Sequence, residues 1–219
     1  SFFPLTELSA SGYSSIYVGQ KTYNGVALLS KQLGCDVITT IPNFEDDQKR
    51  VVAATYGDIR VVCIYVPNGE SVDSEKFQYK LNWLSALNRW LREELTQFPK
   101  LVLLGDFNIA PADSDVHNPE LWKDQVLCSS PERDAFQNLL NLGLYDSFRL
   151  FEQPGKSYTW WDYRMLAFRL NKGLRIDHIL LSKALTESCE SCVIDKTPRK
   201  LERPSDHTPV VVTLKIDQI

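Results

Sequence analysis

Residues 101–115 read LVLLGDFNIAPADSD, and they are predicted to form the central strand of the fold and the loop after it. The apolar run 101–104 is short, which favours a strand buried on both faces over a helix. Gly105 lets the backbone turn, and Asp106 and Asn108 follow. In an extended chain these two side chains point to the same side. A buried strand then delivers a carboxylate and an amide to a sheet edge, unless this is only a strand followed by an Asx-rich turn.

Strand patterns surround this stretch on both sides. Residues 51–56 and 59–66 flank Gly57-Asp58, which is a strong hairpin signal. A hairpin argues for antiparallel or mixed sheets, and against a doubly wound parallel sheet. Further extended segments are predicted over residues 16–18, 26–30, 37–40, 158–163, 174–182, 193–194 and 208–216.

Two helices are predicted from their apolar periodicity and their end signals. Residues 74–98 repeat apolar side chains at steps of three and four, as a helix with one face in the core does. The second helix begins at Ser129, with Pro131 in its first turn and Glu132 able to close a capping box, and it ends at Gly143. Helices outside stacked sheets are the economical packing for these elements, which predicts an α/β fold.

The composition is that of an ordinary globular protein, with 43% hydrophobic and 24% charged residues among 219. We expect a single domain over residues 1–219. No apolar run is as long as a membrane span, so the sequence predicts no membrane protein. Three of the five cysteines are scattered, and the lone C-x-x-C at 189–192 lacks a second ligand pair for zinc. Reduced thiols of this kind are typical of a cytoplasmic protein.

Charge is unevenly distributed along the chain. The net charge of −4 excludes a protein that coats nucleic acid by charge alone. Residues 156–203, however, carry 10 basic and 6 acidic side chains, a net of +4. This local excess suits an anionic polymer held near a metal ion, although a solvated loop surface would have the same composition.

Polar residues stand at or near the ends of several predicted strands. Tyr65 ends one strand, Asp106 and Asn108 follow another, Asp177 lies within a third, and Asp206-His207 precede the last. Gathering them in one stack of sheets would be costly unless they pair or hold a cation. His207 is a candidate acid or base beside Asp206, with Asp177 as its orienting partner. We expect His117 and His178 to be structural, and Asp113 and Asp115 to tie down the loop.

These groups suit hydrolysis of a phosphate ester. Carboxylates can hold Mg²⁺, which prefers oxygen ligands and substrate phosphate. The ion and the Asn108 amide would offset negative charge in the transition state, and a carboxylate or the His–Asp pair would activate water.

Several motifs, in this order along the chain, resemble one nuclease family. They are GQKTYNGVALLS, IYVPNGE, LLGDFNIAP, SSPERDAFQNLL, GLRIDHILLS and PSDH-x-PV, and they run from about Gly19 to Leu214. They resemble the exonuclease III family of Mg²⁺-dependent apurinic/apyrimidinic endonucleases, within the DNase I-like endonuclease/exonuclease/phosphatase superfamily. The resemblance implies a four-layer α/β sandwich with two stacked mixed sheets flanked by helices.

The resemblance also implies a role for each matching residue. Asp106 would activate water or protonate the leaving oxygen, and Asn108 would stabilise the transition state. Asp177 would orient His207, which would contact the phosphate and transfer protons. Tyr65 would lie against the scissile phosphate. The metal ligands would be Asp106, Asn108, Asp206 and His207.

DNA contacts are implied in the same way. Asn68 would touch the DNA backbone, and Trp160, Leu174 and Ile176 would form an apolar pocket for a flipped sugar that lacks its base. Shape selects such a sugar, because it offers little to hydrogen-bond. Arg164, Arg169 and Lys172 would contact the backbone beside this pocket.

One departure concerns the start of the chain. The family opens with an Asn-x-Asn strand and has a glutamate metal ligand on a later strand, and the residues from Ser1 onward match neither. The only methionine is Met165. We therefore expect the domain to be incomplete at its N-terminus and the natural protein to be longer.

The function expected from the sequence is hydrolysis, in duplex DNA, of the phosphodiester 5′ to an abasic site, leaving a 3′-hydroxyl. The cofactor would be Mg²⁺, with Mn²⁺ as a substitute, and the enzyme would act as a monomer. A 3′-to-5′ exonuclease or 3′-phosphatase activity would accompany it. Two rivals remain: a lipid or inositide phosphodiesterase or phosphatase of the same superfamily, and a non-catalytic relative that only binds nucleic acid.

Overall fold

The computed structural model describes residues 3–216 and is built around a mixed six-stranded sheet in the order β3-β4-β5-β6-β8-β7. β5 and β6 run parallel, and the other neighbouring strands are antiparallel. The predicted central strand is confirmed as β6, which lies between β5 and β8. The strands are β3 (Cys35–Ile38), β4 (Val51–Tyr56), β5 (Ile59–Tyr65), β6 (Leu101–Asp106), β7 (Leu144–Asp146) and β8 (Asp177–Ser182).

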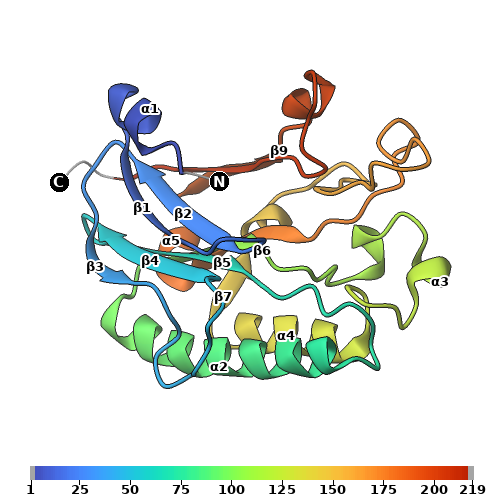
Figure 1. The fold of residues 1–219 in the computed structure, drawn as a ribbon, viewed down its shortest axis with the longest axis horizontal. Coiled ribbons are helices and arrows are strands. Elements are labelled where there is room, and N and C mark those ends of the chain that lie inside the picture. Colours follow the sequence, from blue (N-terminus) through green and yellow to red (C-terminus); the bar gives the residue numbers. More distant parts are fainter. Residues whose placement is uncertain (1–2, 217–219) are drawn as a thin grey trace.

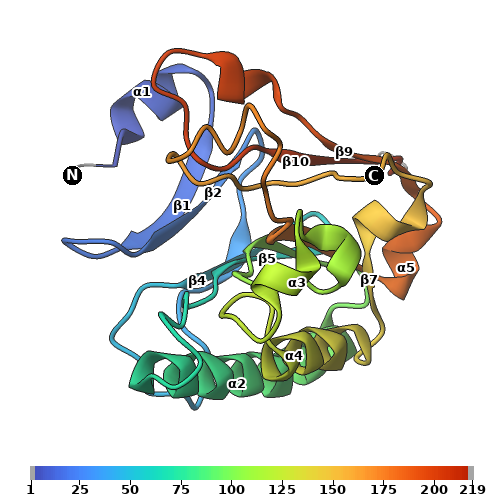
Figure 2. The same cartoon turned by 90° about the vertical axis from the view of Figure 1, so that its right-hand side faces the viewer.

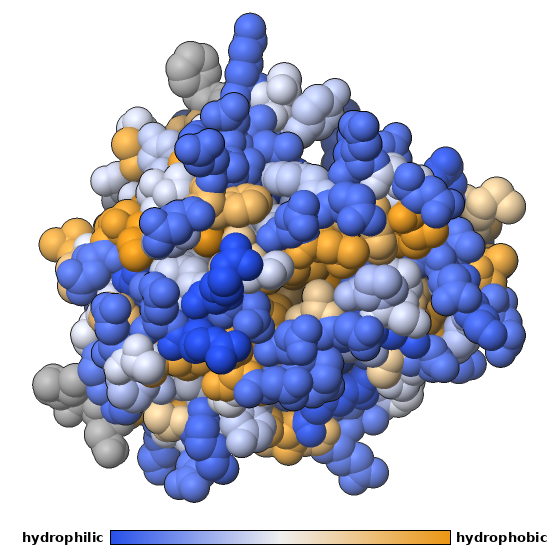
Figure 3. Space-filling view, turned by 90° about the horizontal axis from the view of Figure 1, so that it is seen from below, coloured by the Kyte–Doolittle hydropathy of each residue, from blue (hydrophilic) through white to orange (hydrophobic). Residues whose placement is uncertain are grey.

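Helices cover one face of this sheet. α2 (Glu75–Gln97) and α4 (Ser130–Leu140) lie side by side beneath it (Figure 1). Strand alternation turns Val51 and Ala53 of β4 toward the helices, where they join one large core cluster with Trp83 and Leu87 of α2. The outer side of this helical layer shows mostly hydrophilic residues, with smaller hydrophobic areas between them (Figure 3). The predicted apolar stripe of the long helix therefore faces the core.

Two further two-stranded sheets lie over the opposite face (Figures 1 and 2). β1 (Ser14–Gly19) pairs with β2 (Gly25–Ser30), and β9 (Cys189–Ile194) pairs with β10 (Val210–Leu214). The first pair packs on Val52 and Ala54, and the second packs on Val102 and Leu181. The mixed α/β fold is confirmed. Within residues 3–216, the second layer consists of two separate strand pairs and not of one continuous sheet.

The ends of both predicted helices match the structure to within a few residues. The Ser74 hydroxyl caps α2 by accepting a hydrogen bond from the Phe77 N–H (3.1 Å). At the start of α4 the Ser129 N–H donates to the Glu132 carboxylate (3.1 Å), which is one half of the predicted capping box.

Short elements depart from the sequence-based prediction. The extended segment predicted over residues 158–163 makes isolated bridges through Trp160, and the strand predicted from Leu174 begins at Asp177. The remaining short helices, none of which was predicted, are α1 (Leu5–Ala10), η1 (Asp113–Asp115), α3 (Pro119–Trp122), η2 (Ser147–Leu150), α5 (Lys183–Thr186) and η3 (Thr197–Lys200). Segments this short depend on tertiary contacts, because too few local hydrogen bonds stabilise them. Among the described residues, every helix is too short or too polar to cross a bilayer.

Candidate active site

Three neighbouring strands bring three of the predicted residues to one line across the sheet. Tyr65 of β5 is paired with Asp106 of β6, and Asp106 is paired with Asp177 of β8. Gly105 makes this edge possible, because its φ of +138° is unfavourable for other residues and an added Cβ would overlap the Ile64 carbonyl oxygen. Residues that lie far apart in the chain therefore meet at one point.

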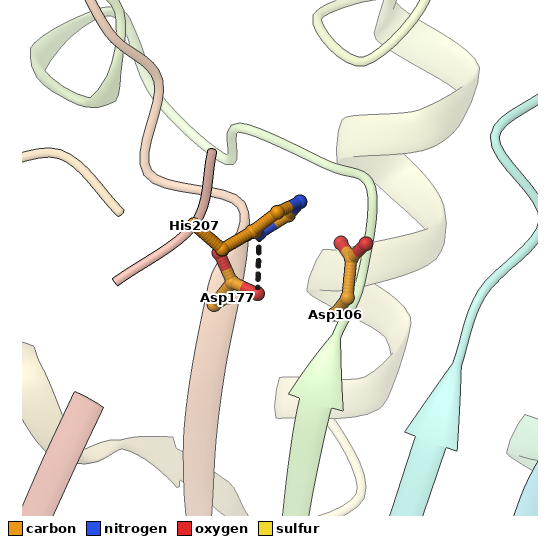
Figure 4. A group of neighbouring side chains, drawn as sticks. All are labelled: Asp106, Asp177 and His207. Carbon is orange, nitrogen blue, oxygen red and sulfur yellow. Dashed lines mark hydrogen bonds and ion pairs between the residues drawn. The ribbon is translucent and has the colours of Figure 1, made fainter. Parts of the chain in front are cut away.

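His207 completes the cluster from the segment before β10. Its Nδ1 lies 2.9 and 3.0 Å from the two carboxylate oxygens of Asp177, so Nδ1–H donates to this carboxylate. Potential ligand atoms of Asp106, Asp177 and His207 all lie within 4.8 Å of one another. Figure 4 shows the imidazole and the Asp106 carboxylate pointing toward the same space. The predicted orienting role of Asp177 has the geometry it needs.

The pKa values of Asp106 and His207 both lie above the ordinary values of these side chains. Burial, together with the Asp177 charge, raises the pKa of Asp106 to about 7. Burial lowers the pKa of His207, but the hydrogen bond and charge of Asp177 outweigh it and raise this pKa to about 9. At neutral pH His207 is therefore a cation, while Asp106 is poised to gain or lose a proton.

Asn108 is held against Asp106 in a left-handed backbone conformation, with φ of +49°. Its N–H donates to Asp106 Oδ1 (2.8 Å), and its Nδ2 donates to the Val66 carbonyl oxygen (3.0 Å). Its Oδ1 accepts a hydrogen bond from Asn68 Nδ2 (3.3 Å). The structure thus brings Asn68 and Asn108 together beside the acidic cluster. Next to them a cleft of about 540 Å³ is lined in part by Tyr65 and Asn68.

The other predicted contacts are arranged differently from the expectation. Asp206 turns its carboxylate to the Trp160 indole N–H (3.0 Å), outside the group formed by Asp106, Asp177 and His207. Leu174 and Ile176 are fully buried in a core cluster against which Trp160 packs, so neither lines an open pocket in this conformation. Arg164 is exposed and pairs with Asp162 (2.7 Å). Contact of these residues with metal or DNA stays a prediction.

The clustered donors fit a hard divalent cation. Two carboxylates approach each other closely, and burial of Asp106 beside Asp177 disfavours a second negative charge. A cation between them would remove this penalty, and oxygen donors are the ligands that Mg²⁺ prefers. Asp106 and Asp177 are the carboxylates placed to hold it, with the Asn108 amide adjoining, and His207 would join them only as a neutral imidazole, after it has lost its proton.

A buried ion network behind the cluster has no counterpart in the sequence-based prediction. The Arg175 guanidinium donates to Asp115 (2.7 Å) and Asp146 (2.8 Å), and it also lies 3.0 Å from Nδ1 of His178. His178 Nε2–H then donates to the carbonyl oxygen of Ile109 (2.9 Å). This network ties the loop after β6 to the start of β8. The predicted structural roles of Asp115 and His178 are confirmed, and the only sequence signal for Arg175 is its place two residues before Asp177.

Comparison with known proteins agrees with this architecture. The model of the Endonuclease/Exonuclease/phosphatase family matches residues 2–207. Exodeoxyribonuclease III of Haemophilus influenzae is 37% identical over 226 residues, which cover 97% of this chain and 85% of the relative. A 3′ phosphatase from Neisseria, solved with a product DNA hairpin, superposes with a TM-score of 0.96 at 48% identity, covering 98% of this chain and 84% of that one. An AP endonuclease from Archaeoglobus fulgidus gives 0.93 at 36% identity, with coverage of 98% and 84%.

Strand order, acidic cluster and relatives lead to one assignment: this chain belongs to the Endonuclease/Exonuclease/phosphatase family and, within it, to the hydrolytic nucleases of the exonuclease III and AP endonuclease type.

Proposed function

We propose that this enzyme hydrolyses the phosphodiester 5′ to an abasic site in duplex DNA and leaves a 3′-hydroxyl. The observation that carries the proposal is the meeting of Asp106 and Asp177, at the ends of the neighbouring strands β6 and β8, with His207 from the segment before β10. In-line attack of water on a phosphate diester is helped by a group that transfers protons near neutral pH and by positive charge beside the phosphate. Asp106, with a pKa of about 7, and the His207 cation have these properties.

Each residue has a distinct part in this reaction. The His207 imidazolium, held by Asp177, binds a phosphate oxygen and offsets the charge that develops on it. Asp106 takes the proton of the attacking water, or gives a proton to the leaving 3′-oxygen. Asn108, whose amide donates to the Val66 carbonyl oxygen and to Asp106, would turn a donor to the same phosphate, and Tyr65 would pack beside it. A bound Mg²⁺, or Mn²⁺ in its place, supplies additional positive charge at this point.

Duplex DNA is the proposed partner of a monomeric enzyme. Asn68 lies next to Asn108 and the cleft, so it is placed for a backbone contact. Trp160 is half-buried and held by Asp206, while Arg164 is exposed nearby. Leu174 and Ile176 support Trp160 from within the core. They would reach a base-less sugar only if the loop around them opens on binding.

A second candidate function is removal of a 3′-phosphate or a 3′-terminal nucleotide. The observation in its favour is the 48% identity to the Neisseria protein, which is described as a 3′ phosphatase bound to product DNA. The attack at phosphorus is the same in both reactions. The difference lies in what the enzyme accepts on the far side of the phosphate, a continuing strand or a free end.

Three matched duplexes separate these possibilities: one with an internal abasic analogue, one with a 3′-phosphate at a nick, and one with a recessed 3′-hydroxyl. We expect Mg²⁺-dependent cutting beside the analogue that EDTA abolishes and that Asp106→Asn and His207→Gln each reduce by about 10² or more. Cutting only at the 3′-ends would replace the first function with the second. Binding without cutting by the folded protein would favour a non-catalytic relative. In a parallel assay, hydrolysis of inositol phosphates and of none of the duplexes would favour a lipid or inositide phosphodiesterase or phosphatase.

A further inference from the structure

A fully buried ion pair lies beneath the active site. Lys80 of α2 and Glu132 of α4 form it, and both side chains are 0% exposed. The helical stripe predicted from the sequence does not account for a lysine at this position, because lysine on a helix is usually solvated. Burying two charges is expensive, and apolar side chains of similar size often serve stability as well or better. A reason other than stability therefore has to explain the pair.

The Lys80 ammonium bonds to the main chain of both site asparagines. Its Nζ donates to the carbonyl oxygens of Asn68 (3.0 Å) and Asn108 (2.7 Å), and its third bond goes to the Glu132 carboxylate. Asn68 follows β5 and Asn108 follows β6, so one cation joins two separate loops. The tetrahedral ammonium has three N–H donors, and each has an acceptor.

Glu132 is anchored in turn by the chain that leads into α4. Its carboxylate accepts hydrogen bonds from the N–H groups of Leu127 (2.9 Å) and Ser129 (3.1 Å). The Leu127 carbonyl oxygen accepts from the Ala110 N–H (2.7 Å), two residues beyond Asn108. The ion pair therefore has a fixed position relative to both loops.

We propose that the Lys80–Glu132 pair is a positioning element that aligns the side-chain amides of Asn68 and Asn108 on the reacting phosphate. The Asn68 and Asn108 side chains already meet at 3.3 Å, and their two main-chain carbonyl oxygens share the same ammonium donor. Without the ammonium, the buried carbonyl group of Asn108 and the partly buried carbonyl group of Asn68 lose their shared donor, and the two loops can move independently. The catalytic part of this proposal rests on the proposed function; the part concerning loop order does not.

The test removes both charges together, since a single replacement would leave a buried charge alone and prevent folding. The variant is Lys80→Met with Glu132→Gln, which keeps side-chain size and an acceptor for the helix cap. The matched control is Arg60→Met with Glu94→Gln. That pair is also buried, with side chains 1% and 6% exposed, and it contacts other parts of the fold. Both double variants are compared at a temperature where urea titration shows them folded.

We expect kcat on the abasic duplex to fall by about 10² in the Lys80/Glu132 variant, with a smaller change in KM, and to stay within about twofold of wild type in the control. Hydrogen exchange measured by mass spectrometry should accelerate over residues 66–69 and 107–110 in the Lys80/Glu132 variant alone. Equal kcat losses in both variants, or unchanged exchange over these residues, would overturn the proposal. If wild type cuts none of the duplexes, the proposed function fails. The hydrogen-exchange comparison then still tests whether the Lys80–Glu132 pair fixes the positions of the two loops.

Discussion

Replacing Asp177 with asparagine isolates the interaction that makes His207 a cation. The hydrogen bond and charge of Asp177 raise the pKa of His207 from 6.5 to about 9, against the effect of burial. The introduced amide has the same shape as the carboxylate and can still accept from Nδ1–H, so the substitution removes mainly the charge. We expect the pKa of His207 to fall toward 6.5, a change of about 2.5 pH units, or about 3 kcal/mol.

The assay is an NMR titration of the imidazole signals in metal-free protein containing EDTA. The three histidines should separate well. Burial and the Arg175 charge lower the pKa of His178 to about 4, and burial also lowers the pKa of His117. His207 is therefore the histidine with the highest pKa, and the one whose titration moves in the variant.

Stability should follow the same pair with a defined sign. Because the pKa of His207 is higher in the folded than in the unfolded protein, its contribution is fully present below pH 6.5 and disappears as the pH rises to 9. As the pH rises from 6.5 to 9, urea titrations should show the free energy of unfolding of wild type falling by about 3 kcal/mol more than that of Asp177→Asn. A variant whose His207 pKa stays within about half a pH unit of wild type would refute the assignment of the shift to Asp177.

Three further perturbations test the surrounding structure. As the pH falls from 6.5 to 4, wild type should lose about 3 kcal/mol of unfolding free energy, because the unfolded chain binds a proton at His178 and the folded protein does not; His178→Gln should not show this loss. Urea midpoints of both proteins at several pH values measure the difference, and parallel curves would contradict it. Gly105→Ala should cost more than about 3 kcal/mol, because its Cβ overlaps the Ile64 carbonyl oxygen; a thermal midpoint near wild type would show that β5 and β6 can separate there. Leu103→Ala should cost about 2–5 kcal/mol by leaving a cavity in the core, measured by urea unfolding; a cost below about 1 kcal/mol would mean that the site collapses around the smaller side chain.

Much of the fold follows from local pattern. The apolar run before Gly105, the Gly57-Asp58 turn and the stripe of the long helix each predict an element that the structure contains. Strands of the second layer were predicted too, but not their division into two separate pairs, because that depends on contacts with the central sheet more than on local sequence. Trp160 illustrates the limit: its segment is extended but forms only isolated bridges.

The candidate site, too, could be predicted only in part from the sequence. Strand ends and a rare histidine were enough to select Asp106, Asn108, Asp177 and His207 from the sequence. Asp206 stands beside His207 in the sequence, yet its carboxylate turns to Trp160. Leu174 and Ile176 were expected at a pocket and are buried in the core. Adjacent residues of an extended chain point to opposite sides, so sequence proximity alone does not say which side faces the substrate.

The sequence by itself determined which residues could end strands, cap helices and carry charge, because these properties depend on neighbours a few positions away. Only the tertiary structure decided that Asp106 lies opposite Asp177 across two strands, and that Lys80 donates hydrogen bonds to the main chain of Asn68 and Asn108. Both results depend on the register between strands and on the packing of a helix against loops that lie far from it in the chain. Such contacts form only where burial of the whole core offsets the cost of ordering the chain and desolvating its charges.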